Sequence, residues 1–182
     1  MPLKYLVPIL LSVCLASCNY SSKDVRVYKV KKKQSSQVTK PEPVSGINWE
    51  APESWTPKAV SSMHLAAFDI PVEGGNASLS IMTLAGDGGG MLLNVNRWLN
   101  QLDLAPVEEG ALPGMSKQIE SINGPFTVFT IKNPTKPEGA FNVAVVQMAE
   151  QTLFVKMVAP LQEIDTLWPV FETFCQSIKF ER

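Results

Sequence analysis

Alternating apolar and polar residues predict a series of strands between residues 47 and 182. The first two span residues 63–70 and 77–84 and are joined by a Gly-rich turn. Four more are predicted over residues 117–122, 126–131, 140–148 and 152–159. Asn123-Gly124 and Ala149-Glu150-Gln151 are turn segments between them, so these four strands form two further hairpins.

Apolar residues at helical spacing predict two principal helices. The first runs from Met91 to about Leu104 and ends before Pro106. Its apolar face comprises Met91, Leu92, Val95, Trp98, Leu99 and Leu102. The second begins near Thr166 or Leu167, because Pro169 fits only the first turn of a helix. This element order predicts an α+β domain over residues 47–182, with a mainly antiparallel sheet packed against two principal helices.

The first 17 residues have the pattern of a secretory signal: Lys4 and then an apolar run from Tyr5 to Ala16. A membrane-spanning helix needs about 20 apolar residues, so this run is too short to be one. Leu15-Ala16-Ser17-Cys18 resembles the lipobox of bacterial lipoproteins. The resemblance implies cleavage before Cys18 and acylation of that residue with chains such as palmitate. The alternative is a simple export signal cut near Ala16.

Asn19 follows the cysteine, where an Asp would imply retention at the inner membrane in enteric-type sorting. The lipoprotein resemblance therefore implies the cell envelope, with the outer membrane and the periplasm favoured in a Gram-negative organism. Residues 18–46 are rich in Ser, Lys, Gln and Pro, which predicts a flexible basic tether. Its lysines at positions 29, 31, 32 and 33 would attract anionic headgroups. A short strand over Val25–Lys31 is the alternative.

The charge changes sign along the chain. From Pro41 onward there are eight basic and sixteen acidic residues, a net charge of −8. An acidic surface repels phosphate, so nucleic acid is excluded as a partner of the domain.

A glycine loop, Gly86-Asp87-Gly88-Gly89-Gly90, immediately precedes the first predicted helix. Such a loop can bind phosphate or carboxylate through backbone N–H groups. Neither phosphate-binding signature fits, because no Gly-Lys-Ser/Thr follows and Met91 stands where a dinucleotide fingerprint needs Gly or Ala. Asp87 is better placed to cap the helix than to welcome an anion. A tight structural turn is favoured, and a ligand loop is the alternative.

The polar side of the first helix carries amides and an arginine instead of the usual Lys and Glu. Asn is a poor helix former, and three of them here imply that something offsets the local cost. The amides therefore either tether loops of the same chain or bind a partner. In the second case Asn94, Arg97, Trp98 and Gln101 form what we call the predicted contact face.

The glycine loop followed by Asn94-Val95-Asn96-Arg97-Trp98 and Gln101-Leu102 resembles a motif of a group of bacterial lipoproteins and secreted proteins. The likeness extends over most of residues 47–180, but it brings no known activity and no catalytic residue. In its order of elements the domain is also similar to the PsbP-like fold of photosystem II extrinsic proteins. That similarity implies a curved antiparallel sheet between helices and says little of function.

Catalytic chemistry finds little support in the sequence. His64 is the single histidine, which excludes a His-based metal cluster, and no Gly-x-Ser-x-Gly elbow occurs. Cys175 lies on the apolar stripe of the second helix and is expected to be a buried thiol. No catalytic residue, metal or cofactor is predicted.

Two functional hypotheses remain. The leading one is a membrane-anchored, non-enzymatic binding or assembly module that meets an envelope partner through the predicted contact face. The competing one is a small-ligand (anion) binder or enzyme that uses the Gly86–Gly90 loop. An open polar pocket at that loop would favour the second hypothesis, and a loop sealed by side chains would favour the first.

Overall fold

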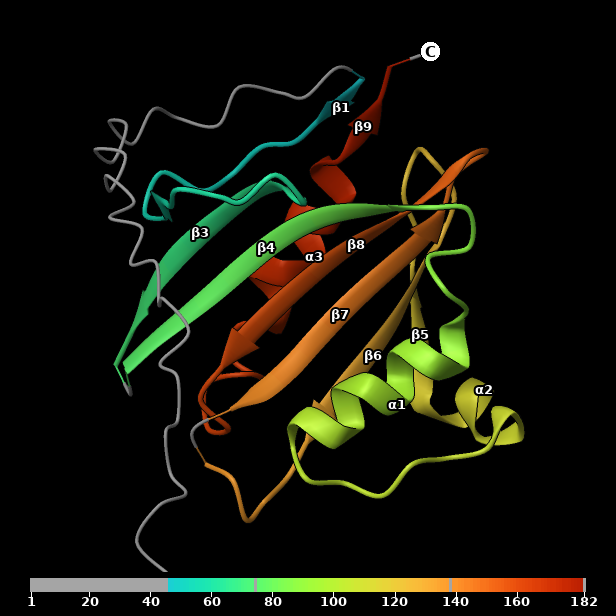
Figure 1. Ribbon diagram of the computed structural model, residues 1–182. Coiled ribbons are helices and arrows are strands. Elements are labelled where there is room, and N and C mark those ends of the chain that lie inside the picture. The colour runs from blue at the N-terminus through green and yellow to red at the C-terminus, as the bar shows by residue number, and fades with distance from the viewer. Residues whose placement is uncertain (1–45, 74, 138, 182) are drawn as a thin grey trace, which may run out of the picture. The chain divides into compact units, whose positions relative to one another are not determined.

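The computed structural model describes residues 46–73, 75–137 and 139–181. Seven strands form one antiparallel sheet in the order β2-β3-β4-β8-β7-β6-β5 (Figure 1). In chain order they are β2 (Thr56–Pro57), β3 (His64–Val72), β4 (Gly75–Ala85), β5 (Ser116–Ile119), β6 (Phe126–Lys132), β7 (Ala140–Gln147) and β8 (Gln151–Ala159). β1 (Ile47–Asn48) and β9 (Lys179–Phe180) pair separately. All three predicted hairpins are confirmed.

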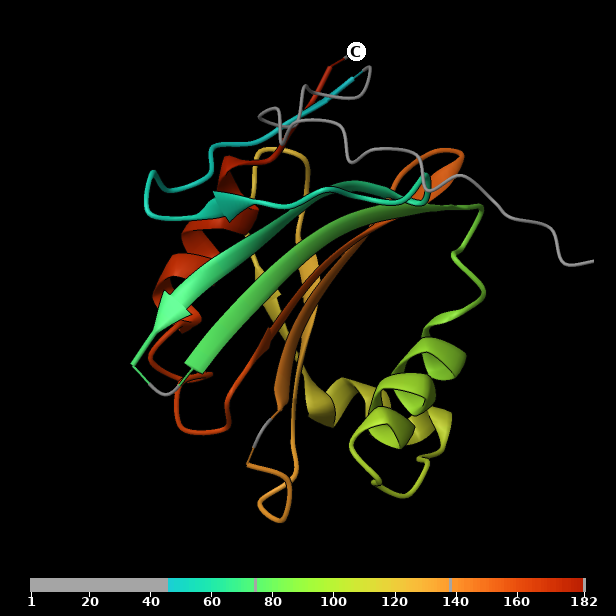
Figure 2. The ribbon, with the colours of Figure 1, turned by 60° about the vertical axis from the view of Figure 1, so that its left-hand side comes forward.

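Two principal helices lie on opposite faces of this sheet, α1 (Met91–Gln101) on one and α3 (Trp168–Ser177) on the other (Figures 1 and 2). The α+β class with a mainly antiparallel sheet is therefore confirmed. A 3-10 turn η1 (Glu109–Ala111) and a short helix α2 (Leu112–Met115) follow α1. These elements and strands β1, β2 and β9 are too short to give a periodic signal in the sequence.

Helix α1 ends at Gln101, three residues before the predicted end. Asp103 takes a positive φ of 54°, a left-handed conformation that Asp tolerates better than most residues. The backbone N–H of Leu104 then turns back to the carbonyl of Leu99, at 3.0 Å. The chain therefore leaves the helix before Pro106 is reached.

The side chains of the sheet divide into two apolar layers. Under α3, Phe171, Phe174 and Cys175 pack against strand residues such as Leu79 and Val155. Under α1, the buried cluster comprises Val95, Trp98, Leu99, Leu102, Phe129, Ile131, Phe141, Val143, Val145 and Phe154. Strand β7 is buried from Ala140 to Val146 because both layers meet on it.

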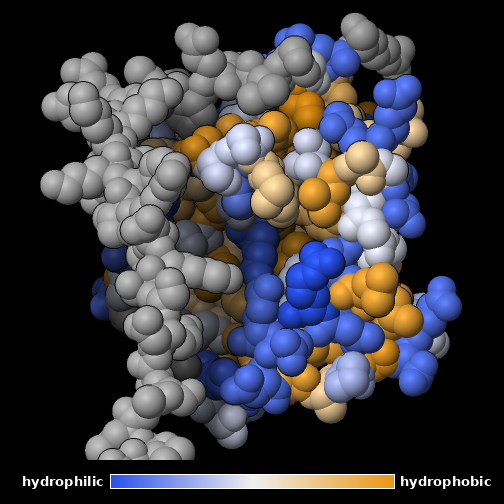
Figure 3. All heavy atoms as spheres, viewed as in Figure 1, coloured by the Kyte–Doolittle hydropathy of each residue, from blue (hydrophilic) through white to orange (hydrophobic). Residues whose placement is uncertain are grey.

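Helix α1 covers only part of its face of the sheet. Its apolar partners come from β6, β7 and β8, and beyond them lies a half-exposed surface that we call the open face. The open face consists of Ala67, Asp69, Ser78, Ser80, Met82, Leu84, Lys156 and Val158. Figure 3 views the molecule from this side and shows hydrophilic residues in a recess beside the surface formed by α1.

Several N-terminal predictions lie outside the described residues. These are the signal peptide, Cys18, and residues 18–45 of the tether. Among the residues that the structure describes, no helix is long and apolar enough to cross a membrane.

Two leucines of α1 provide a matched test of this packing. Leu99 is 5% exposed and Leu93 is 67% exposed. Leu99→Ala should lower the free energy of unfolding by about 2–5 kcal/mol, because it removes buried methyl groups and leaves a cavity. Leu93→Ala should change it by no more than about 0.5 kcal/mol. Urea unfolding of both variants measures the difference, and equal losses would show that α1 does not pack as described.

Candidate functional site

The glycine loop is tied to the β7–β8 hairpin at its first residue. The N–H of Gly86 donates to the carbonyl of Glu150 at 2.8 Å. The carbonyl of Gly86 accepts from Gln147 Nε2 at 3.0 Å and from Thr152 Oγ1 at 2.8 Å. These bonds fix the loop at the end of the sheet where β4 gives way to α1.

Asp87 does not cap helix α1, and that prediction is wrong. Its Oδ1 accepts from the backbone N–H of Gly89 at 2.9 Å, while the N-cap residue is Gly90 and makes no side-chain cap bond. The turn through Gly88 and Gly89, both at positive φ, brings the Gly89 N–H to the carboxylate before the helix begins. Asp87 therefore orders the loop itself.

Gly88 packs where no side chain fits. Its φ is +66°, and a Cβ added there would lie 2.7 Å from the ring of Phe154 and 3.2 Å from Cβ of Thr152. The residue is accordingly buried against β8. This close packing explains why glycine occupies position 88, and the explanation requires no ligand.

An open pocket of about 460 Å³ lies between the start of α1 and the end of the sheet. Gly90 and Met91 line it from the start of α1, and Thr127 and Val145 line it from β6 and β7. The other lining residues are Asp87, Asn123, Gly124, Pro125, Val146, Gln147 and Thr152. Asp87 is the single charged residue among them, so the lining is otherwise amide, hydroxyl and apolar. Asn123, Thr127, Gln147 and Thr152 were not predicted as site residues, because they come together only when the strands pair.

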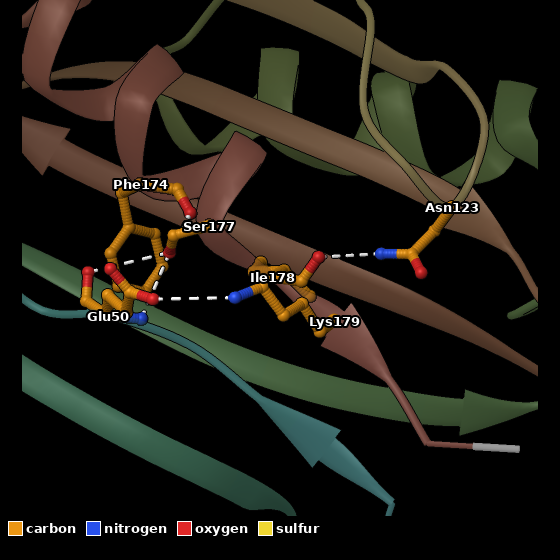
Figure 4. Close-up of polar contacts among 6 residues, drawn as sticks. All are labelled: Glu50, Asn123, Phe174, Ser177, Ile178 and Lys179. Atoms are coloured by element: carbon orange, nitrogen blue, oxygen red, sulfur yellow. Dashed lines mark hydrogen bonds and ion pairs between the residues drawn. The ribbon is translucent and has the colours of Figure 1, made fainter.

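Asn123, which lines the pocket, is hydrogen-bonded to Ile178 after helix α3 (Figure 4). Asn123 Nδ2 donates to the carbonyl of Ile178 at 2.6 Å, and the N–H of Phe180 donates to Asn123 Oδ1 at 3.3 Å. Ser177 Oγ accepts from the N–H of Glu50 at 3.0 Å, which joins α3 to the segment after β1. The amide of Asn123 is thus engaged in positioning the turn.

The predicted contact face is divided by the fold. Asn94 is 2% exposed and Trp98 is 5% exposed, so neither is offered to a partner in this structure. The ring centroid of Trp98 lies 6.1 Å from that of Phe129 and 6.3 Å from that of Phe154. Only the remaining pair, Arg97 and Gln101, is exposed.

Asn94 and Asn96 tether neighbouring loops, one of the two alternatives that the sequence left open. Asn94 Nδ2 donates to the carbonyls of Gly88 and Gly90, each at 2.9 Å. Asn96 donates to the carbonyl of Val107 at 3.0 Å and accepts from its N–H at 2.8 Å. Arg97 Nη1 in turn donates to Asn94 Oδ1 at 3.1 Å. These bonds offset the poor helix propensity of Asn.

Lys156 is a second chemically distinctive group that the sequence analysis missed. Its Nζ donates to Gln101 Oε1 at 2.5 Å and lies 3.8 Å from the centroid of the Phe141 ring. Desolvation by the surrounding side chains lowers the pKa of Lys156 from its ordinary 10.5 to about 8. One feature of the sequence could have indicated it. Lys156 is the only charged residue of β8, and it lies between Phe154 and Val158 on the side of the sheet that faces α1.

The cysteine, the histidine and the acidic residues of the described chain form no further candidate site. Cys175 is fully buried, and burial together with the nearby charge of Glu172 raises the pKa of its thiol, so the predicted core thiol is confirmed. Nδ1 of His64 lies 3.1 Å from Ser61 Oγ. Within residues 46–73, 75–137 and 139–181, no group of three His, Cys, Asp or Glu residues could hold a metal ion.

No family model matches the chain, and no curated protein matches it. Among solved structures it is similar to the solution structure of cyanobacterial PsbP (CyanoP) from Synechocystis sp. PCC 6803. The identity is 14% and the TM-score 0.49, over 75% of this chain and 87% of that chain. A crystal structure from Bacteroides thetaiotaomicron has 9% identity and a TM-score of 0.46, over 78% of this chain and 47% of that chain. The similarity to a PsbP protein expected from the element order is thus found, and it concerns the fold alone.

Removal of the Asn94 amide should destabilise the fold. Asn94→Ala leaves the carbonyls of Gly88 and Gly90 without their side-chain donor, which should cost about 1–3 kcal/mol of unfolding free energy. Asn100 is the control, since it is exposed on the same helix. Asn100→Ala should be neutral or stabilising by up to about 0.7 kcal/mol, because Ala is the better helix former. Chemical denaturation compares the two, and a neutral Asn94→Ala would refute the tethering role.

The stability of the protein should depend on the protonation of Lys156. Between about pH 8 and 10.5 the unfolded chain retains this proton while the native protein loses it. The free energy of unfolding should therefore rise with pH across this window, relative to Lys156→Met. Ser80 faces Lys156 from β4, Phe141 and Val143 from β7, and Gln101 from α1. Arg97 is the one charged residue on these three elements, and Asp69 lies on the next strand, β3. Urea titrations at several pH values test the difference, and parallel curves would contradict it.

Proposed function

We propose that the protein is a lipid-anchored, non-enzymatic binding module of the bacterial cell envelope, and that it binds through the pocket at the glycine loop. The observation that carries this proposal is the open pocket of about 460 Å³ between α1 and the Asn123-Gly124-Pro125 turn. Concave sites with a few fixed polar groups are the usual form of ligand and partner pockets. An open pocket at this loop is the feature expected of the small-ligand hypothesis, so the case for a protein partner rests on the charge of the lining and on the exposed residues around the pocket.

The lining of the pocket supports a ligand that donates hydrogen bonds. Asp87 contributes the only formal charge, and it is negative. An anion would meet this carboxylate, so the anionic form of the ligand hypothesis is disfavoured. Catalysis is also disfavoured, because a single titratable group in the lining provides no acid–base or nucleophile–base pair.

An exposed apolar side chain beside the pocket favours a protein partner over a free solute. Ile122 precedes Asn123 of the pocket lining and is 76% exposed. A donor-bearing loop of an envelope protein that entered the pocket could cover it. Leu93 and Arg97, exposed on α1, would extend this contact.

The membrane location rests on the N-terminal sequence. Leu15-Ala16-Ser17-Cys18 supports lipidation of Cys18, and Asn19 supports the outer membrane facing the periplasm in a Gram-negative organism. The basic residues that follow support contact with anionic headgroups. Membership of a bacterial lipoprotein group that shares the glycine-loop motif is part of the same proposal.

Cys18→Ala should abolish anchoring, because the acylated thiol is lost. Fractionation should find the variant released from the membrane or unprocessed, and labelled palmitate should no longer be incorporated. Cys175→Ala is the control, since that thiol is buried in the domain; it should retain the label. Palmitate incorporation that persists in Cys18→Ala would sink the lipidation assignment.

Site-specific photo-crosslinking in cells tests the pocket. A photoreactive residue at position 122 should capture an envelope protein, whereas one at the exposed position 63 should not. Asp87→Asn preserves an oxygen acceptor for the Gly89 N–H but removes the charge, so capture should fall while thermal stability is kept. Thr127→Phe fills the pocket and should also reduce capture.

Two outcomes would change this conclusion. If neither Asp87→Asn nor Thr127→Phe reduces capture, the partner does not bind in the pocket. Absence of capture, combined with a small molecule that native mass spectrometry detects on the native protein and not on Thr127→Phe, would establish the small-ligand alternative.

A further inference from the structure

Lys156 occupies the middle of the open face with polar groups converging on it. Ser80 of β4 is its direct cross-strand partner, so both side chains emerge on the same side of the sheet. Gln101 reaches it from the last residue of α1, at 2.5 Å from its Nζ. The ring of Phe141 lies beneath the ammonium. Three elements thus meet around a single amine.

No carboxylate compensates this amine within the described ranges. Four of the six lysines there pair with acids, namely Lys58, Lys132, Lys136 and Lys179. Lys117 lies over the ring of Trp168 on the other side of the sheet. Asp69 is on the open face, but Lys58 holds it at 2.8 Å. Lys156 is therefore a partly buried positive charge whose polar contact is a neutral amide.

The hydrogen-bonding groups around Lys156 include unused donors. Its ammonium has three N–H groups, of which one donates to Gln101 Oε1. Among the described residues, neither Gln101 Nε2 nor Ser80 Oγ forms a side-chain hydrogen bond, and Gln101 bonds only through its Oε1. A group that only accepts hydrogen bonds and carries negative charge would complement this set, as a carboxylate or phosphate does.

Apolar residues flank the polar centre along β4 and β8. Met82 and Val158 are partly exposed and face the same side as Lys156. Met82 and Leu84 form a strip that runs from the charged centre toward the end of β4, and Val158 lies on the other side of that centre. The surface therefore combines one cationic point with an apolar strip.

We propose that Lys156, Gln101 and Ser80 bind the anionic head group, carboxylate or phosphate, of a small amphiphile whose apolar body lies along Met82 and Leu84. This site is separate from the pocket at the glycine loop and does not rest on the function proposed for it. The lowered pKa of Lys156 supports a functional reading, because an uncompensated, desolvated charge destabilises the native state. A ligand that supplies the missing negative charge removes that cost.

Saturation-transfer difference NMR on the mature, lipidated protein in detergent micelles tests the site, with empty micelles as blank. The probes are hexanoate and hexyl phosphate, with acetate and inorganic phosphate as head groups alone and hexylamine as the reversed charge. Hexanoate or hexyl phosphate should bind, and the better of the two identifies the head group. Lys156→Met should weaken that binding by about tenfold or more.

The control is Lys179→Met, which removes an exposed lysine paired with Glu50 and should leave probe binding unchanged. Thermal unfolding of the same samples should place Lys156→Met at or above the native midpoint, as expected when a desolvated charge is removed. Three results would overturn the proposal: probe binding that survives in Lys156→Met, hexylamine binding equal to that of hexanoate, or absence of binding by every anionic probe. Equal binding of acetate and hexanoate would show that the apolar residues beside Lys156 do not contribute to binding.

Discussion

Strand β7 must be covered on both faces, and the architecture follows from that requirement. Seven of its eight residues are buried, so its sequence is almost continuously apolar. Helix α3 covers one face and α1 covers the other. A single short helix is narrower than a seven-stranded sheet, however, and the buried strand residues under α1 come from β6, β7 and β8. The pocket lies at one end of this helix, and the open face lies along its side.

The polar groups of α1 serve this covering role more than a surface role. Asn94 turns inward and closes the glycine loop, and Asn96 holds the segment around Val107. Gly88 leaves room for the ring of Phe154, so the loop can approach β8 closely. The motif that looks most functional in the sequence is therefore largely a device for docking a helix. What it leaves exposed are Asp87, Arg97 and Gln101 at its margins.

Local patterns sufficed to predict much of the fold. The alternation in residues 77–84 and 152–159 predicted the strands, and the helical spacing placed Val95, Trp98 and Leu99 in the core. Each of those features depends on neighbours within a few residues. The orientation of Asn94 was not predictable in this way, because helical projection places it on the flank of the apolar face. Only the folded loop reveals the carbonyls that it binds.

The candidate sites depend on contacts across long stretches of sequence, which explains why the sequence did not disclose them. Asn123 meets Ile178 across 55 positions, and Lys156 meets Gln101 across the same separation. Neither contact follows from composition or spacing, because each requires the register of the whole sheet. Lys156 left a local trace, as a charge in an otherwise apolar strand, but its missing counter-charge is visible only in three dimensions.

The two candidate sites also differ in the sign of their charge. Asp87 lies before the first turn of α1, and Lys156 lies near its last residue, so each charge complements the adjacent end of the helix dipole. The dipole alone accounts for an exposed acid at the N-terminus at little cost. It does not account for a desolvated amine whose pKa falls to about 8, since a contact that stabilised the ammonium would raise that pKa. The charge of Asp87 therefore costs the fold little, whereas the charge of Lys156 destabilises the native state. This difference makes Lys156 the stronger candidate for binding a ligand of opposite charge.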